Sequence, residues 1–208
     1  MRRGYFLRSQ LQAQSIRSDG ALTVVGASAL DDIAVGGDMS YSDTYWDDLF
    51  VPLTTTRVGS NSKPDFDYTN IGYLFPNNDA AEILYFIIQF PHRWKTGTTV
   101  FPHVHWRQAA NQTPVFKLDY KWYSIGEAPP ANFSTYTMDQ LAVTYTSGTL
   151  HQISNGAAGI SGAGKGISSI MVCKLYRQDS AYTGDCLVDQ FDIHHEIDAP
   201  GSRTEYTK

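Results

Sequence analysis

Two histidines separated by one residue are the clearest candidates for chemistry in this chain. His103 and His105 flank Val104 in the run FPHVHW. Residues two apart on a β-strand point to the same face, so both imidazoles can reach one metal ion, as the HxH pattern does in cupins. The alternative is a pair of structural hydrogen bonds on the face opposite Val104 and Trp106. The glutamate of the cupin pattern is missing from Arg107–Asn111, so we expect no metal or other cofactor and keep His103 and His105 only as candidates. Side chains that could add ligands are His92, His194, His195 and Glu196.

A glycine-rich stretch from Gly159 to Gly166 is the second motif that could do chemistry. It nearly matches the phosphate-binding pattern GxxxxGK[ST], but Gly166 stands where the Mg²⁺-binding hydroxyl is required. The residues that follow, Ser168–Arg177, have the pattern of a strand, whereas phosphate binding needs a helix N-terminus there. We therefore predict a flexible loop. No motif marks a catalytic acid, base or nucleophile, so we expect no enzymatic activity.

The elements that must position these residues are strands. Val115–Ser124 alternates with period two, which places Phe116, Leu118, Tyr120 and Trp122 on one apolar face. Asp185–Ile197 has Phe191 and Ile193 on one face and Asp192 and His194 on the other. No helical periodicity of about ten residues or more is present, which favours an all-β fold, an antiparallel β-sandwich of jelly-roll type. The other predicted strands are 48–53, 82–90, 99–107, 133–145, 150–154 and 168–177.

Two of these segments are predicted to form a central hairpin. Glu82–Phe90 is apolar on both faces, which predicts a strand that is covered on both faces. Lys95–Gly97 then turns the chain, and Thr99–Arg107 returns beside it. Before this hairpin, the stretch 54–78 is rich in Ser, Asn, Pro, Asp and Gly, so we expect one long loop that is functional or forms an interface.

The first part of the chain differs from the rest. We expect an extended N-terminal arm over residues 1–43, with a short strand at Leu22–Val25, and the sandwich domain over residues 44–208. The arm carries an excess of positive charge that either contacts an acidic partner or lies in solvent. The arginines concerned are Arg2, Arg3, Arg8 and Arg17.

Composition narrows the classes of function. Of the 208 residues, 13% are aromatic and only 18% are charged, which favours a surface that is partly buried in an assembly over a merely polar β surface. The net charge is −5, which argues against a nucleic-acid partner, and no segment is long enough to span a membrane as a helix. The two cysteines, Cys173 and Cys186, could pair across a hairpin, but we expect them to be buried and reduced.

Four segments in a fixed order resemble a family of tailed-bacteriophage virion structural proteins. They are YWDDLFVPLT (45–54), FPHVHW (101–106), GKGISSIMVCKLYR (164–177) and EIDAPGSRTEYTK (196–208). The resemblance extends over residues 44–208 and implies a virion component without enzymatic activity.

The resemblance leads to the following expectations about function. A β-sandwich of this size suits a capsid cement (decoration) protein on the surface of the phage capsid. Its partners would be the major capsid protein of the shell and further copies of itself in a homotrimer, and assembly would take place in the host cytoplasm. The alternatives are a tail, neck or head-fibre component, or a cupin-like metal-binding or carbohydrate-binding β-sandwich.

Overall fold

The computed structural model describes residues 40–208, except residues 42, 61, 78, 110–111, 142–143, 157, 179–183, 206 and 208. The predicted strand at Leu22–Val25, the four arginines of the predicted arm and nearly all of the arm itself therefore lie outside the described residues.

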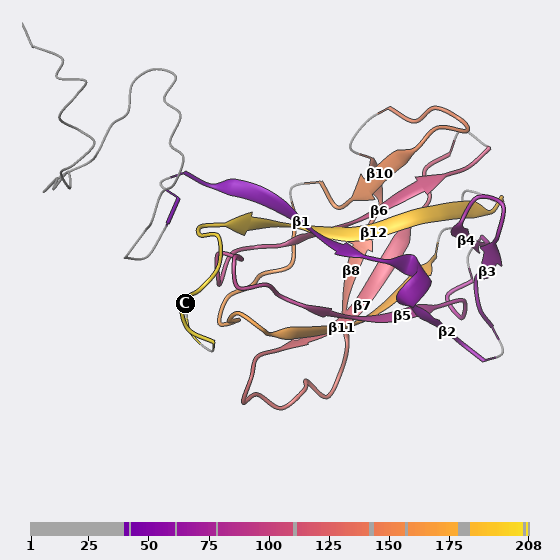
Figure 1. The fold of residues 1–208 in the computed structure, drawn as a ribbon. Coiled ribbons are helices and arrows are strands. Elements are labelled where there is room, and N and C mark those ends of the chain that lie inside the picture. The colour runs from indigo at the N-terminus through magenta and orange to yellow at the C-terminus, as the bar shows by residue number, and fades with distance from the viewer. Residues whose placement is uncertain are drawn as a thin grey trace, which may run out of the picture. The chain divides into compact units, whose positions relative to one another are not determined.

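The described part of the chain contains twelve strands and one short 3₁₀ turn, η1 (Leu53–Thr55). Every strand pairing is antiparallel, and the strands form two sheets (Figure 1). The strands are β1 (Tyr45–Val51), β2 (Arg57–Val58), β3 (Asp65–Asp67), β4 (Gly72–Phe75), β5 (Leu84–Gln89), β6 (Phe101–Arg107), β7 (Phe116–Tyr123), β8 (Ser134–Met138), β9 (Gln140–Leu141), β10 (His151–Ser154), β11 (Ile170–Arg177) and β12 (Cys186–Ile197).

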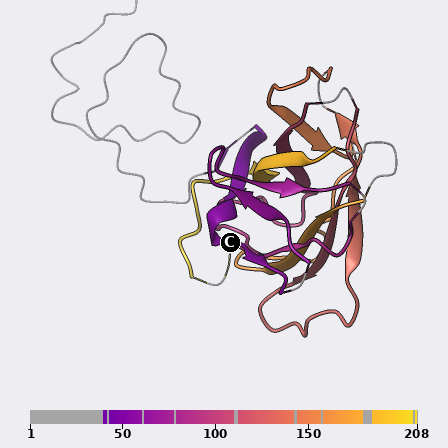
Figure 2. The ribbon, with the colours of Figure 1, turned by 90° about the vertical axis from the view of Figure 1, so that its right-hand side faces the viewer.

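The eight main strands follow the order of a jelly roll. One sheet has the order β1-β12-β6-β10, and the other has the order β5-β11-β7-β8. The chain therefore moves between the sheets in the pattern of two Greek keys, and the jelly-roll prediction is confirmed. The short strands β3, β4 and β9 extend the first sheet, and β2 extends the second. Figure 2 shows the sandwich turned by 90°, with the β7–β8 loop projecting from it as it does in Figure 1.

The core lies between the two sheets and follows the predicted alternation. On β7, Phe116, Leu118 and Trp122 are buried, and the neighbouring strand β11 of the same sheet buries Met171, Cys173 and Leu175 beside them. Both cysteines are free and buried, as expected. They are not hairpin partners, because β11 and β12 belong to different sheets.

The prediction of a central hairpin was wrong. β5 belongs to one sheet and β6 to the other, so residues 90–100 cross between the sheets, with Trp94 fully buried in this link. The prediction that this strand is covered on both faces was also wrong. Burial alternates along β5, and Tyr85 and Ile87 are exposed. The prediction failed because the face of this strand that points to solvent carries apolar residues as well.

The prediction of one long loop over residues 54–78 was also wrong. This stretch contains β2, β3 and β4, which are two to four residues long. β4 pairs with the beginning of β12, and β2 pairs with β5. Strands this short leave no readable period in the sequence, and their position depends on the longer strands that they join.

No helix in the described part of the chain is long and apolar enough to cross a membrane.

Candidate functional site

A β-bulge in β12 decides which side chains meet the two histidines. Val188 pairs with Trp106, but the next pair joins Gln190 to His105, so Asp189 is an extra residue on this strand. Strict alternation would place Val188 and Phe191 on opposite faces, yet both are fully buried in the core. The extra residue reverses the alternation, and the side chains beyond it change face as a group.

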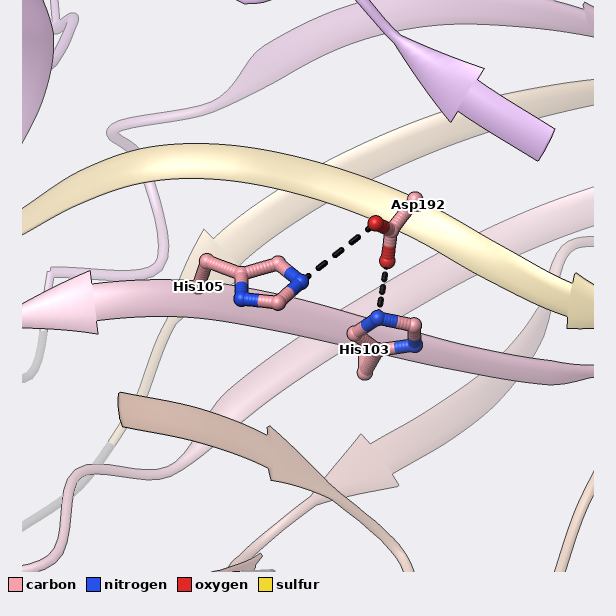
Figure 3. A group of neighbouring side chains, drawn as sticks. All are labelled: His103, His105 and Asp192. Atoms are coloured by element: carbon pink, nitrogen blue, oxygen red, sulfur yellow. Dashed lines mark ion pairs between the residues drawn. The ribbon is translucent and has the colours of Figure 1, made fainter. Parts of the chain in front are cut away.

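The bulge brings Asp192 onto the outer face of the sheet, directly beside His103. The two residues are register partners on β12 and β6. His103 Nε2 forms an ion pair with Asp192 Oδ1, and His105 Nε2 lies 3.3 Å from Asp192 Oδ2 (Figure 3). His103 and Asp192 are almost completely buried, whereas His105 is partly exposed. The predicted HxH pair therefore faces a common carboxylate, on the side of the sheet opposite Val104 and Trp106.

Further hydrogen bonds orient these three side chains. His103 Nδ1 lies 3.3 Å from the carbonyl oxygen of Phe101, to which it can donate. Gln190 Nε2 donates to Asp192 Oδ2 at 2.9 Å. A neutral His103 carries its proton either on Nε2, which then donates to the Asp192 carboxylate, or on Nδ1, which leaves a lone pair on Nε2. With the lone pair on Nε2, the two acceptors in this buried place need a cation between them, such as a metal ion.

The pKa of the Asp192 carboxyl reflects two opposing effects. Burial raises it, but the hydrogen bonds from His103 and His105, together with their charge, outweigh burial and hold the pKa well below its ordinary value. The carboxyl group is therefore ionised across the physiological range of pH. In this state it offers full negative charge to whatever cation stands beside it.

His194 lies next to this group but faces β1. Its ring centroid is 4.0 Å from that of His103, and its Nε2 lies 2.9 Å from Asp48 Oδ1. Burial lowers the pKa of His194, and the neighbouring His103 lowers it further. The outer face of β1, β12 and β6 thus carries alternating histidines and carboxylates.

A cleft of about 660 Å³ opens beside these residues. Trp46 and Phe101 line this cleft and contact each other edge to face, with ring centroids 5.6 Å apart. The cleft leads from solvent to His103, so a small ligand or ion can reach the buried histidine. The cleft is lined by Trp46, Asp47, Asp48, Phe101, His103, Gln152, Ser154, Gly156 and His194.

The other residues named as possible ligands lie elsewhere. His92 contacts Ser202 Oγ and Ser168 Oγ, and Glu196 forms an ion pair with Lys95. His195 is fully buried on the core face of β12. Asp192, which completes the group, was not predicted as a ligand. The sequence indicated only that Asp192 shares a face of its strand with His194. It did not indicate that Asp192 pairs with His103, because the bulge shifts the register of β12.

The glycine-rich stretch forms a loop, as predicted. Ile160 pairs with Val100 through an isolated bridge, and Gly164 turns with a positive φ of 76°. The strand β11 follows this loop, so it offers no helix N-terminus for a phosphate.

Comparison with known proteins identifies no family. No protein-family model and no curated protein matches the chain. Among solved structures, the CBM22-1–GH10 modules of Clostridium thermocellum endo-1,4-β-D-xylanase 10B, complexed with xylohexaose, match 78% of the chain at 14% identity and a TM-score of 0.35. The enzymatically active domain of tailspike protein 4 of bacteriophage CBA120 matches 75% of it at 11% identity and a TM-score of 0.31. The match spans 27% of the xylanase chain and 20% of the tailspike chain.

Proposed function

We propose that this chain is a structural virion protein of a tailed bacteriophage, specifically a capsid cement protein that binds the outer shell and joins neighbouring capsomers. In this proposal it has no catalytic activity, and its partners are the major capsid protein and further copies of itself. Two kinds of observation support the proposal, the four sequence segments that resemble such proteins and the apolar outer surface of the sandwich.

An exposed apolar groove is the structural observation that carries the proposal. The groove has a volume of about 570 Å³, and residues of β1, β5 and β11 line it. Phe50 and Ile87, both at the groove, are more than half exposed, at 51% and 65%. Lys174 lies over the Phe133 ring, 3.9 Å from its centroid, and both residues also line the groove. Contiguous exposed apolar surface of this kind is typical of sites that contact other proteins.

The strand β1 adds a second contact element. Within the described residues, β1 pairs only with β12, so its other edge has backbone groups free for a partner. Its side chains Tyr45, Trp46 and Phe50 are about half exposed. Aromatic side chains supply most of the binding energy in many protein interfaces. A cement protein that binds only the assembled shell stabilises that shell by mass action.

Binding to purified shells tests this proposal. Shells that lack the protein are mixed with the wild-type chain, with Ile87→Lys in the groove, or with Ile125→Lys. Ile125 is the matched control, because it is 67% exposed and does not line the groove. We expect the wild type and Ile125→Lys to sediment with the shells, and Ile87→Lys to bind at least about tenfold more weakly, since a charge in an apolar contact is costly. Wild-type protein that stays in the supernatant, or equal binding of both variants, would overturn the proposal.

The first alternative is a tail, neck or head-fibre component. The same groove and edge strand would serve such a protein, with a different partner. Locating the protein in a map of the virion separates this alternative from a position on the capsid.

The second alternative is a cupin-like metal-binding or carbohydrate-binding sandwich, and the grouping of His103, His105 and Asp192 favours it. Against a catalytic role, these residues lie on the outer face of a sheet and not between the two sheets. Turnover assays with the metal-loaded protein would test it.

A further inference from the structure

We propose that His103, His105 and Asp192 form a binding site for a divalent transition metal of the zinc class, on the outer face of the sheet formed by β1, β12, β6 and β10. This site is independent of the groove and of the proposed attachment to a capsid. It would join the middle of β6 to the middle of β12.

The geometry of the three side chains suits one ion. Each offers one ligand atom, and these atoms all lie within 4.8 Å of one another. Ligand atoms in a tetrahedral zinc site, with bonds of about 2.0–2.1 Å, lie about 3.4 Å apart. The side chains would have to adjust to reach this spacing, and His105 is the partly exposed one of the three. The adjoining cleft gives an ion access to His103 and leaves room for a water molecule as a further ligand.

The surroundings are those of metal-ligating side chains. A ligating histidine usually donates its other ring nitrogen to a carbonyl or carboxylate, which fixes the tautomer and orients the ring. The contact of His103 Nδ1 with the Phe101 carbonyl has this form. A ligating carboxylate is itself usually hydrogen-bonded, as Asp192 is by Gln190. With the His103 proton on Nδ1, the lone pair on Nε2 is available to a metal ion beside Asp192.

The ligand types select the class of metal. Two imidazoles and one carboxylate suit Zn²⁺ and neighbouring first-row metals, whereas Ca²⁺ and Mg²⁺ prefer sites made of oxygen ligands. The two cysteines are buried and do not belong to this group, which argues against a thiolate site. The competing explanation is a purely structural hydrogen-bonded group that binds no metal, and direct titration distinguishes the two.

The experiment uses the full chain, treated with EDTA and then dialysed. Isothermal titration with ZnSO₄ is expected to show one site per chain, and MgCl₂ and CaCl₂ to show none. Because the ion binds the native state only, zinc at about 100 times its Kd should raise the Tm by about 5 °C or more. His105→Gln is expected to weaken zinc binding at least about tenfold and to abolish most of this rise. His105 is the preferred target because it is partly exposed, so its replacement is tolerated better than that of His103.

His92→Gln is the matched control. His92 is another of the six histidines, and it contacts Ser168 and Ser202 rather than this group. It should bind zinc as the wild type does, which would show that the loss is particular to the site. Absence of zinc binding by the wild type, equal affinity in His105→Gln, or equal loss in His92→Gln would overturn the proposal. Asp192→Asn is a supporting variant. If it fails to fold, His105→Gln decides the result alone.

Discussion

Trp122 stacks on Phe90, with ring centroids 4.4 Å apart and ring planes inclined by 21°. The indole nitrogen of Trp122 also donates a hydrogen bond of 2.9 Å to Ser169 Oγ. β7 thus contacts the end of β5 and the beginning of β11 through a single side chain, and Trp94 of the crossing link lies against both rings.

We predict that Trp122→Ala lowers the free energy of unfolding by about 3–5 kcal/mol, since it leaves a large cavity and an unpaired Ser169 hydroxyl. Urea denaturation measures this change. Ile125→Ala is the control, because Ile125 is mostly exposed and its loss should change stability by no more than about 0.5 kcal/mol. A cost below about 1 kcal/mol for Trp122→Ala would contradict its place in the core.

The bulge at Asp189 yields a prediction about register. Deleting Asp189 restores strict alternation, which would direct either Val188 or Phe191 to solvent. We therefore expect the deletion variant to lose cooperative thermal unfolding, as measured by circular dichroism.

Asp189→Ala serves as its control. That substitution keeps the extra residue and removes only the ion pair with Arg107, whose two contacts are 2.6 and 2.8 Å long. The pair is partly exposed, so its loss should cost no more than about 1 kcal/mol. A deletion variant as stable as Asp189→Ala would show that the strand adjusts its register without cost.

Burial raises the pKa of the Cys173 thiol far above its ordinary value, so the thiol stays protonated at neutral and mildly alkaline pH. The reactive species in thiol modification is the thiolate. We expect neither cysteine to react with Ellman's reagent within minutes in the folded protein at pH 8, and both to react in guanidinium chloride. Rapid reaction of one equivalent without denaturant would contradict this expectation.

Stability should fall between pH 7 and pH 5 because of His195. Burial lowers the pKa of His195, and a backbone hydrogen bond involving Ile193 opposes this effect only in part. Below pH 6.5, His195 of the unfolded chain binds a proton that His195 of the folded protein does not. The contribution of His195 to stability is therefore complete above this pH and is lost as the pH falls. His194 contributes in the same direction. The charged groups that act on His195 are Asp47, Arg93 and Asp48.

Urea denaturation at pH 7.5 and pH 5.5 measures this dependence. His195→Gln removes one titrating group and should reduce the loss of stability between the two pH values. An unchanged difference in His195→Gln would mean that other groups account for it.

The prediction of a homotrimer remains to be tested. Light scattering at micromolar concentration should give about three times the chain mass of 23.2 kDa. If the groove or the edge of β1 forms the contact, Phe50→Asp should shift the protein toward monomer, whereas Ile125→Asp should not, because Ile125 does not line the groove. A monodisperse wild-type monomer would contradict the prediction.

The strands with a clean period were predictable from sequence, and the relationships among them were not. Phe116 and Trp122 indicate the buried face of β7, because every second residue from Phe116 to Trp122 is large and apolar. On β5, the outward residues Tyr85 and Ile87 are apolar as well. This pattern is the same for a covered strand and for one that presents a contact surface. Only the arrangement of the sheets distinguishes the two cases.

Two of the three residues of the candidate metal site could be predicted from the sequence, and the third could not. His103 and His105 are close in sequence, so their shared face follows from strand geometry alone. Asp192 joins them through a long-range pairing and an extra residue at Asp189, and neither is visible in local periodicity. A bulge shifts the alternation by one residue without any signature in residue type at this position.

The pairing of β1 with β12 has a consequence for how the protein reaches this structure. Trp46 lies opposite Glu196, so the first and last strands of the jelly roll are neighbours. Contacts between residues so far apart in the chain require closure of a very long loop, and folds dominated by such contacts fold slowly. During synthesis, the sheet that carries His103 cannot be completed until β12 has been made. Until then, the central strand β6 lacks the neighbour that covers one of its edges, and a newly made chain is open to pairing with other strands.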